Sequence, residues 1–146
     1  MAEQLIMYLV DTNIWLERLL NQEKADEVAQ FLSKIPSEHL MITDFTFHSI
    51  GVILSRHNEQ ETLQRFTQDV LIDGAVTLVS LEPTDIQRLI ETMTEYKFDF
   101  DDAYQYVAAE KYSVDLISFD SDFDRAERGR KTPLQVLPKN DGCFKA

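Results

Sequence analysis

The stretch "YLVDTNIWLERLL", residues 8–20, passes directly from an apolar segment into a sequence that is typical of a helix, and Asp11 stands at the junction. A short continuous apolar run favours a strand that is buried on both faces of a sheet. An aspartate at its end has two interpretations. It either caps the following helix by accepting backbone N–H bonds, or it is a ligand at the tip of the strand. The rest of the chain has to distinguish the two.

Strand and helix patterns alternate along the whole chain. Apolar runs predict strands at residues 7–11, 39–43, 75–81 and 115–120, and "LQVL" at 134–137 is a candidate for a short fifth strand. Helical spacing of apolar residues is found at 11–20, 23–35, 44–58, 60–72, from Pro83 onward, and at 101–112. Such alternation predicts right-handed crossovers and a parallel α/β sheet that is covered by helices on both faces.

The size and composition predict one soluble domain. A chain of 146 residues suffices for one core, expected over residues 1–138, and residues 139–146 are expected to form a mobile tail. No apolar run approaches the roughly 20 residues that span a bilayer. The N-terminus has no basic leader, and the single cysteine, Cys143, cannot form an internal disulfide. A cytoplasmic location is therefore expected.

The chain is strongly acidic, with a net charge of −12 and a sequence pI near 4.5. This balance argues against a nucleic-acid binder that is held by a basic surface. It does not exclude a nuclease, because an acidic metal site adds negative charge of its own. Solubility alone is an equally simple explanation of the acidity.

Aspartates follow the predicted strands at one edge of the sheet, and Asp102 begins the helix that leads back into the fourth strand, so its first turn faces the same edge. Ligands of open parallel sheets bind at this edge, outside the carboxyl ends of the strands. Any one of these aspartates could be a helix cap or part of a solvated turn. Their convergence from distant parts of the chain favours a site instead. The residues concerned are Asp11, Asp44, Asp102, Asp120, Asp122 and Asp124.

Three motifs together resemble the landmarks of the PIN-domain ribonucleases, and most closely the VapC-type toxins. They are Asp-Thr-Asn at 11–13, Asp-Ala at 102–103, and "SFDSDF" at 118–123. Their order and spacing extend the similarity over roughly residues 7–137. The resemblance implies a three-layer α/β/α sandwich with a central parallel sheet of four or five strands. It also implies a hydrolase that cuts RNA with the help of Mg²⁺ or Mn²⁺.

Such a reaction assigns roles to the motif residues. A divalent cation lowers the pKa of bound water and compensates charge on the phosphate, and hard cations of this kind take oxygen ligands. We expect Asp11 and Asp120 to be the main ligands, Asp102 a ligand or a water-orienting base, and Asp122 a supporting group or a ligand of a second ion. Orienting hydrogen bonds are expected from Thr12, Asn13 and Ser118.

One position departs from the family pattern. The helix after the second strand normally carries a glutamate, and Ser49 stands at that place. His48 is adjacent, but one step along a helix turns a side chain by about 100°. Asp44 is nearer the strand tip and could approach from the loop. The departure puts metal binding, and with it catalysis, in question.

A single basic cluster follows the third motif. It consists of Arg125, Arg128, Arg130 and Lys131. These side chains could bind the RNA backbone beside the acidic site. A solvated loop without that role is an equally good interpretation.

Three functions are consistent with these observations. The first is a metal-dependent endoribonuclease; if it is a toxin, the resemblance implies a homodimer and a small antitoxin whose tail covers the acidic site. The second is a PIN-like module that no longer cuts and binds RNA or a protein partner, as the departure at Ser49 suggests. The third is a phosphoryl-transfer enzyme with Asp11 as nucleophile, which is weakened because Asn13 replaces the second aspartate of the usual Asp-x-Asp pattern.

Overall fold

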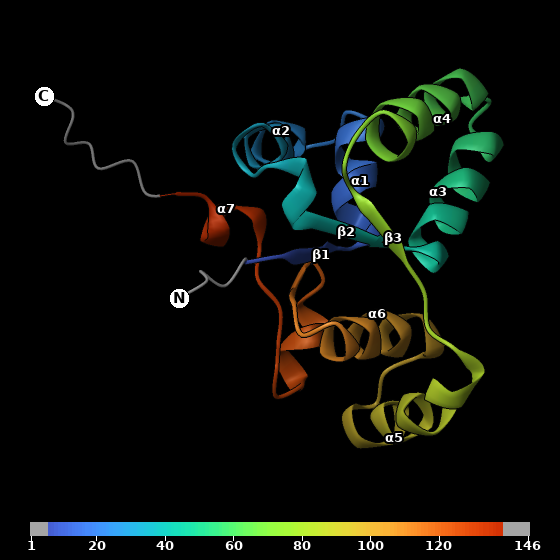
Figure 1. Ribbon diagram of the computed structural model, residues 1–146, viewed down its shortest axis with the longest axis vertical. Coiled ribbons are helices and arrows are strands. Elements are labelled where there is room, and N and C mark those ends of the chain that lie inside the picture. The colour runs from blue at the N-terminus through green and yellow to red at the C-terminus, as the bar shows by residue number, and fades with distance from the viewer. Residues whose placement is uncertain (1–5, 139–146) are drawn as a thin grey trace, which may run out of the picture.

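The computed structural model describes residues 6–138, and its centre is a parallel sheet of four strands in the order β3-β2-β1-β4 (Figure 1). Tyr8 of the first strand pairs with Leu40 on one side and with Asp115 on the other, so this strand is paired with both of its neighbours. The strands are β1 (Tyr8–Val10), β2 (Leu40–Thr43), β3 (Thr77–Val79) and β4 (Asp115–Ile117). The four predicted strands and their parallel arrangement are confirmed.

Helices cover both faces of the sheet and complete a three-layer α/β/α sandwich (Figure 1). One layer contains α1 (Thr12–Leu19), α2 (Ala25–Lys34), α3 (Asp44–Arg56) and α4 (Gln60–Phe66). The other contains α5 (Ile86–Tyr96) and α6 (Phe100–Lys111). Short helical segments are η1 (Ser37–His39), the π-helical η2 (Thr67–Ile72), η3 (Pro83–Asp85), η4 (Ser121–Arg125) and α7 (Pro133–Val136).

Two hydrophobic cores lie on opposite faces of the sheet. Successive side chains of a strand point to opposite faces, so Leu9 belongs to the core under α5 and α6, whereas Val10 belongs to the core under α1–α4. Leu116 and Ile117 of β4 divide in the same way. This double burial is why the strands read as continuous apolar runs.

The predicted fifth strand at 134–137 is wrong. Pro133 occupies the first helical position, and the side chains of Thr132 and Gln135 form a capping box, so α7 begins here. The chain instead touches β4 at Lys131, whose N–H donates to the Leu116 carbonyl at 2.8 Å. The contact stops short of 134–137 because proline has no N–H to donate to a sheet.

Two further expectations concern the limits of the chain. Among residues 6–138, no helix combines the length and the apolar character needed to cross a membrane. The expected mobile tail, residues 139–146, lies outside the described residues.

Candidate active site

A cavity of about 280 Å³ opens at the carboxyl edge of the sheet. Its walls come from the end of β1 and the start of α1, from α3, from the first turns of α6, and from the segment after β4. The structure thus brings together aspartates that are far apart in the sequence. The lining residues are Asp11, Thr12, Asn13, Leu16, Phe45, Ser49, Ile53, Asp101, Asp102, Gln105 and Asp120.

Asp11 forms the buried back wall of the cavity, with 7% of its surface exposed. Its Oδ1 accepts hydrogen bonds from the Thr12 N–H and from Gln105 Nε2, both at 2.8 Å, and its Oδ2 accepts one from Ser118 Oγ at 2.7 Å. Burial raises the pKa of Asp11, and these hydrogen bonds oppose the rise. A carboxylate has about four acceptor positions, so one on Oδ2 stays open. Asp11 is therefore both a helix cap and a wall of the site.

Ser118 connects the first motif to the last. Its hydroxyl donates to Asp11 and accepts from Asn13 Nδ2 at 3.2 Å and from the Asp120 N–H at 3.0 Å. Asn13 in turn accepts from the Phe119 N–H at 3.2 Å. Two of the three predicted orienting residues, Asn13 and Ser118, thus hold the segment after β4 against β1.

Gln105 completes the back of the site, and it has no counterpart among the predicted residues. It is 2% exposed, donates from Nε2 to Asp11 and to Thr46 Oγ1, and accepts at Oε1 from Thr43 Oγ1 at 2.7 Å. Thr46 also accepts a hydrogen bond from the Thr12 hydroxyl at 2.9 Å. The one available signal was its position three residues after Asp102, which places both side chains on one face of the helix.

Three other carboxylates form an open group at the front of the site, of which Asp102 and Asp120 line the cavity and Asp122 does not. Asp102, Asp120 and Asp122 each place an oxygen within 4.8 Å of the others. Asp11, predicted to be a main ligand with Asp120, is not part of this group. Desolvation, followed by the charge of Asp99 and of the other acids, raises the pKa of Asp102 to about 7.

Helix capping accounts for some of the acids but not for all. Asp99 Oδ1 accepts from the Asp102 N–H at 2.8 Å and so begins α6, and Asp120 Oδ1 accepts from the Asp122 N–H at 2.9 Å and so begins η4. No hydrogen bond from residues 6–138 reaches the Asp102 carboxylate. Within the open group, Asp102 is thus the one acid with neither a capping hydrogen bond nor an ion pair in the described part of the chain.

The structure distinguishes the three positions on α3 whose role the sequence left open. Ser49 lines the acidic cavity, whereas His48 lines a different cavity that it shares with Gly51 and Leu63. Asp44 is exposed, and its Oδ1 accepts from the Phe45 N–H and the Tyr104 hydroxyl, both at 2.8 Å. Of the three, only Ser49 is part of the acidic cavity.

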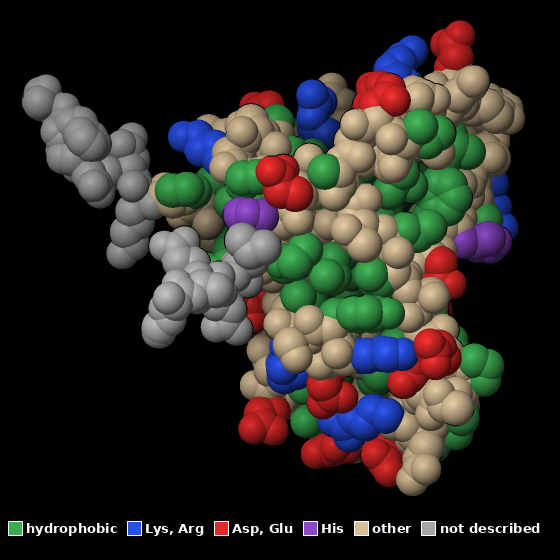
Figure 2. Space-filling model, in the orientation of Figure 1, with side chains coloured by type: hydrophobic (Ala, Val, Ile, Leu, Met, Phe, Trp, Pro, Cys, Tyr) green, Lys and Arg blue, Asp and Glu red, His purple; other side chains and the backbone are tan. Residues whose placement is uncertain are grey.

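All four side chains of the basic cluster form hydrogen bonds or ion pairs within the protein. Arg125 donates to the Tyr96 and Lys97 carbonyls, Arg128 donates to the Val114 carbonyl, Arg130 pairs with Asp124 at 3.2 Å, and Lys131 pairs with Asp115 at 2.8 Å. None of the four lines the acidic cavity. They anchor the loop that carries Asp120 and Asp122, and their contact with RNA stays a prediction. On the face that Figure 2 shows, basic and acidic side chains lie interspersed over the layer of α5 and α6.

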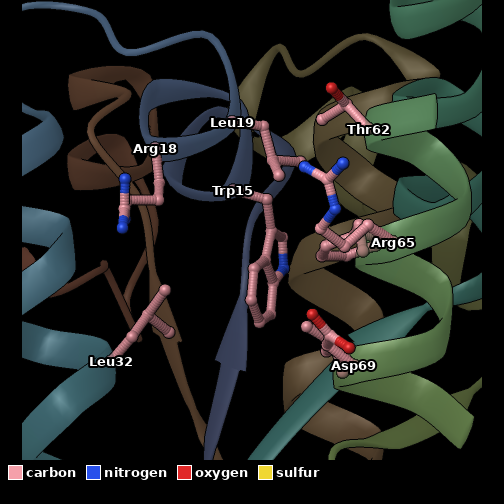
Figure 3. Close-up of a pocket in the computed structure, with 9 residues that line it drawn as sticks. Trp15, Arg18, Leu19, Leu32, Thr62, Arg65 and Asp69 are labelled. Atoms are coloured by element: carbon pink, nitrogen blue, oxygen red, sulfur yellow. The ribbon is translucent and has the colours of Figure 1, made fainter. Parts of the chain in front are cut away.

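A second cavity, of about 390 Å³, lies between α1, α2 and α4 (Figure 3). Trp15 forms part of its wall, donates to the Val10 carbonyl at 3.2 Å, and packs edge-on against Phe66. Arg18 and Arg65 also line it, and Asp69 is its only carboxylate. This cavity therefore lacks the clustered oxygen ligands that a hard cation requires.

Comparisons with known proteins agree with this architecture. A profile of the PIN domain matches residues 8–129, which is most of the chain. A search of curated protein sequences found no match.

Several solved structures share the fold. A toxin–antitoxin complex from Klebsiella pneumoniae is 23% identical with a TM-score of 0.70, covering 86% of this chain and 97% of that one. VapC20 from Mycobacterium tuberculosis, a toxin that cleaves the sarcin–ricin loop, is 15% identical with a TM-score of 0.70, covering 82% and 95%. FitAcB from Neisseria gonorrhoeae is 18% identical with a TM-score of 0.71, covering 89% and 100%. These similarities show the shared fold, and the profile match over residues 8–129 shows that the chain belongs to the PIN-domain family.

Proposed function

We propose that this protein is a divalent-cation-dependent endoribonuclease that hydrolyses RNA phosphodiester bonds at the acidic cavity. The observation that carries the proposal is the group of Asp102, Asp120 and Asp122, whose oxygens lie within 4.8 Å of one another. Like charges at this separation repel. The nearest cation is Arg125, 3.5 Å from Asp122, and its other guanidinium nitrogens are occupied by carbonyls. A bound cation would remove the repulsion.

The residues present fit Mg²⁺ or Mn²⁺. Hard cations take carboxylate oxygens at about 2.0–2.6 Å, so two ligand oxygens on one ion lie no more than about 5 Å apart. The three open carboxylates meet this limit. Asp11 lies outside this group, so the free acceptor position on its Oδ2 would hold a water beside the ion rather than the ion itself.

The chain's own groups would prepare the reaction around that ion. A cation of this kind supplies charge compensation to the phosphate and lowers the pKa of water. A bound cation would lower the raised pKa of Asp102 again, so that Asp102 would be a carboxylate able to take a proton from the attacking water and pass it to the leaving oxygen. Ser118 and Asn13 hold Asp11 and the backbone of Asp120 in place.

A PIN-like module that binds RNA or a protein without cutting is the second candidate function. Two observations favour it. Ser49 contributes no charge to the cavity wall, and three of the four acceptor positions on Asp11 are occupied by protein donors. Both features weaken a metal site relative to a complete ring of free carboxylates.

The toxin role, the partner and the location also belong to the proposal. The neighbour from Klebsiella pneumoniae supports a small antitoxin as partner, because it is itself a toxin–antitoxin complex. We propose that a segment of this antitoxin covers the acidic cavity, that the chain forms a homodimer, and that it acts in the cytoplasm. A short upstream reading frame with a DNA-binding N-terminus would support the pair.

Cleavage of a panel of structured and unstructured RNAs tests the activity directly. We expect cleavage with Mg²⁺ or Mn²⁺, no cleavage in EDTA, and a large loss of cleavage in Asp102→Asn and in Asp120→Asn. RNA binding without cleavage under all conditions would favour the second candidate function.

A further inference from the structure

Three aromatic side chains stand beside the acidic cavity, and we call them the aromatic row: Phe45, Tyr104 and Phe100. The Tyr104 ring centroid lies 6.0 Å from that of Phe45 and 6.1 Å from that of Phe100, with interplanar angles of 42° and 48°. Phe45 itself lines the acidic cavity. Phe100 precedes Asp101 and Asp102, which line the cavity as well. The row and the carboxylates are thus continuous.

Packing does not explain the two outer rings of the aromatic row, whereas Tyr104 also packs against the core under α5 and α6. Phe100 is 46% exposed, and neither Phe100 nor Phe45 belongs to the two hydrophobic cores of the described chain. Buried aromatic rings contribute large apolar areas to a core, which an exposed ring does not. The central ring is nevertheless fixed, since the Tyr104 hydroxyl donates to Asp44 and accepts from the Leu81 N–H at 3.0 Å. The row is therefore anchored through Tyr104 at the edge of the site, with Phe100 open to solvent and Phe45 and Tyr104 half-buried.

The charge of the chain makes such a surface important for an RNA ligand. Most proteins gain affinity for RNA from contacts between cations and phosphates. This chain carries a net charge of −12, and Arg125, Arg128, Arg130 and Lys131 are engaged by the protein itself. Stacking of a base on an aromatic ring needs no net charge.

We propose, on the basis of the nuclease function above, that the aromatic row binds an unpaired nucleobase beside the scissile phosphate. The substrate is then single-stranded RNA or an unpaired loop, because bases in a duplex are stacked on each other and their faces are hidden. Phe45 and Phe100 provide the ring faces, and Tyr104 holds the two in place. A side chain of a protein partner is the competing occupant of the same surface.

Binding of short oligonucleotides tests the proposal. A fluorescent single-stranded RNA is compared with versions that carry one abasic nucleotide at each position in turn, which removes a base and keeps the phosphate. The protein carries Asp102→Asn, so that the RNA is not consumed. We expect a loss of affinity of about 5- to 150-fold at one or two adjacent positions, the value of one stacked base. A matched RNA duplex should bind more weakly than the single strand.

Variants of the row identify the surface responsible. Phe100→Leu and Phe45→Leu keep an apolar side chain but lose the ring, and should reduce the abasic effect severalfold. Phe100→Tyr and Phe100→Trp should retain it. Ile90→Ala removes an apolar side chain, 55% exposed, from α5 and should change nothing.

The outcomes separate this proposal from the nuclease function. If both leucine variants keep the wild-type abasic effect, if duplex binds as well as single strand, or if no oligonucleotide binds, the proposal is overturned and the row is left to a protein contact. If base-dependent binding is found but the wild-type chain cuts no RNA with Mg²⁺ or Mn²⁺, the nuclease function alone fails.

Discussion

Asp11 and Asp102 line the same cavity, but their surroundings differ. Asp11 accepts three hydrogen bonds from the protein and belongs to a buried network with Gln105, Ser118 and Thr46. Asp102 accepts none from residues 6–138 and faces Asp120 and other acids. We call the first set the buried half of the site and the set of Asp102, Asp120 and Asp122 the open half.

The two halves have raised carboxyl pKa values for different reasons. In the buried half, desolvation raises the pKa of Asp11 and hydrogen bonds oppose it. In the open half, desolvation raises the pKa of Asp102 and neighbouring charges add to it. A carboxylate that is unsatisfied and repelled lowers the stability of the fold, and such groups concentrate at functional sites. The buried half should therefore matter most for stability, and the open half for activity.

The largest expected effect is on catalysis by the open half. Asp102→Asn should lower kcat/KM for RNA cleavage by about 1000-fold, because the charge compensation of a bound cation is worth several kcal/mol. It should also abolish most of the rise in melting temperature that millimolar Mn²⁺ causes in the wild type. Kinetic assays and thermal-shift titration measure the two effects.

A matched control is available one turn earlier. Asp99→Asn makes the same change of charge on the same helix, and asparagine caps α6 as well as aspartate does. It should leave cleavage within a fewfold of the wild type. Equal losses in the two variants would mean that general acidity, rather than an ion held by the open half, supports the activity.

The next effect is on stability, through the buried half. Gln105→Leu removes one donor from Asp11 and leaves the Thr43 hydroxyl without its acceptor. Losing a hydrogen bond to a buried charged group costs about 1.5–3 kcal/mol, so the unfolding free energy should fall by about 2–4 kcal/mol. Urea denaturation at neutral pH measures the loss.

An exposed glutamine provides the comparison for that variant. Gln87→Leu on α5 should change the unfolding free energy by no more than about 0.5 kcal/mol. A similarly small loss for Gln105→Leu would contradict the structural importance of the buried network.

Gln105 also shows where the sequence stops being informative. The four strands could be predicted because burial on both faces produces continuous apolar runs. Asp120 and Asp122 could be predicted because they follow a strand end, and Asp102 because it begins a helix at the same edge of the sheet. A glutamine inside a helix usually faces water, and only tertiary packing places it against Asp11. Likewise, the apolar residues at 134–137 suggested a strand, but the capping box at Thr132 and the ring of Pro133 favour a helical turn.

A smaller effect is expected at the departure from the family pattern. Ser49 lines the open cavity, so Ser49→Glu should add a fourth carboxylate near the ion and tighten Mn²⁺ binding by about tenfold, or ~1.4 kcal/mol. Isothermal titration calorimetry measures the affinity. His48→Ala should change little, because His48 lines another cavity. The reverse pattern would mean that the histidine supplies the missing ligand.

The smallest effect is the pH dependence of stability in EDTA. The pKa of Asp102 is about 7 in the folded chain and about 3.9 in an unfolded one, so the folded state binds the proton more tightly. Stability from this group is therefore present at low pH and is lost as the pH rises from about 4 to 7. Asp102→Asn should be more stable than the wild type at pH 8 and close to it at pH 4. Solvent screening of this half-exposed carboxyl limits the difference to about 1 kcal/mol, or at most ~4 °C in melting temperature. A destabilised variant at pH 8 would show that the Asp102 carboxylate stabilises the fold and would place it with the buried half.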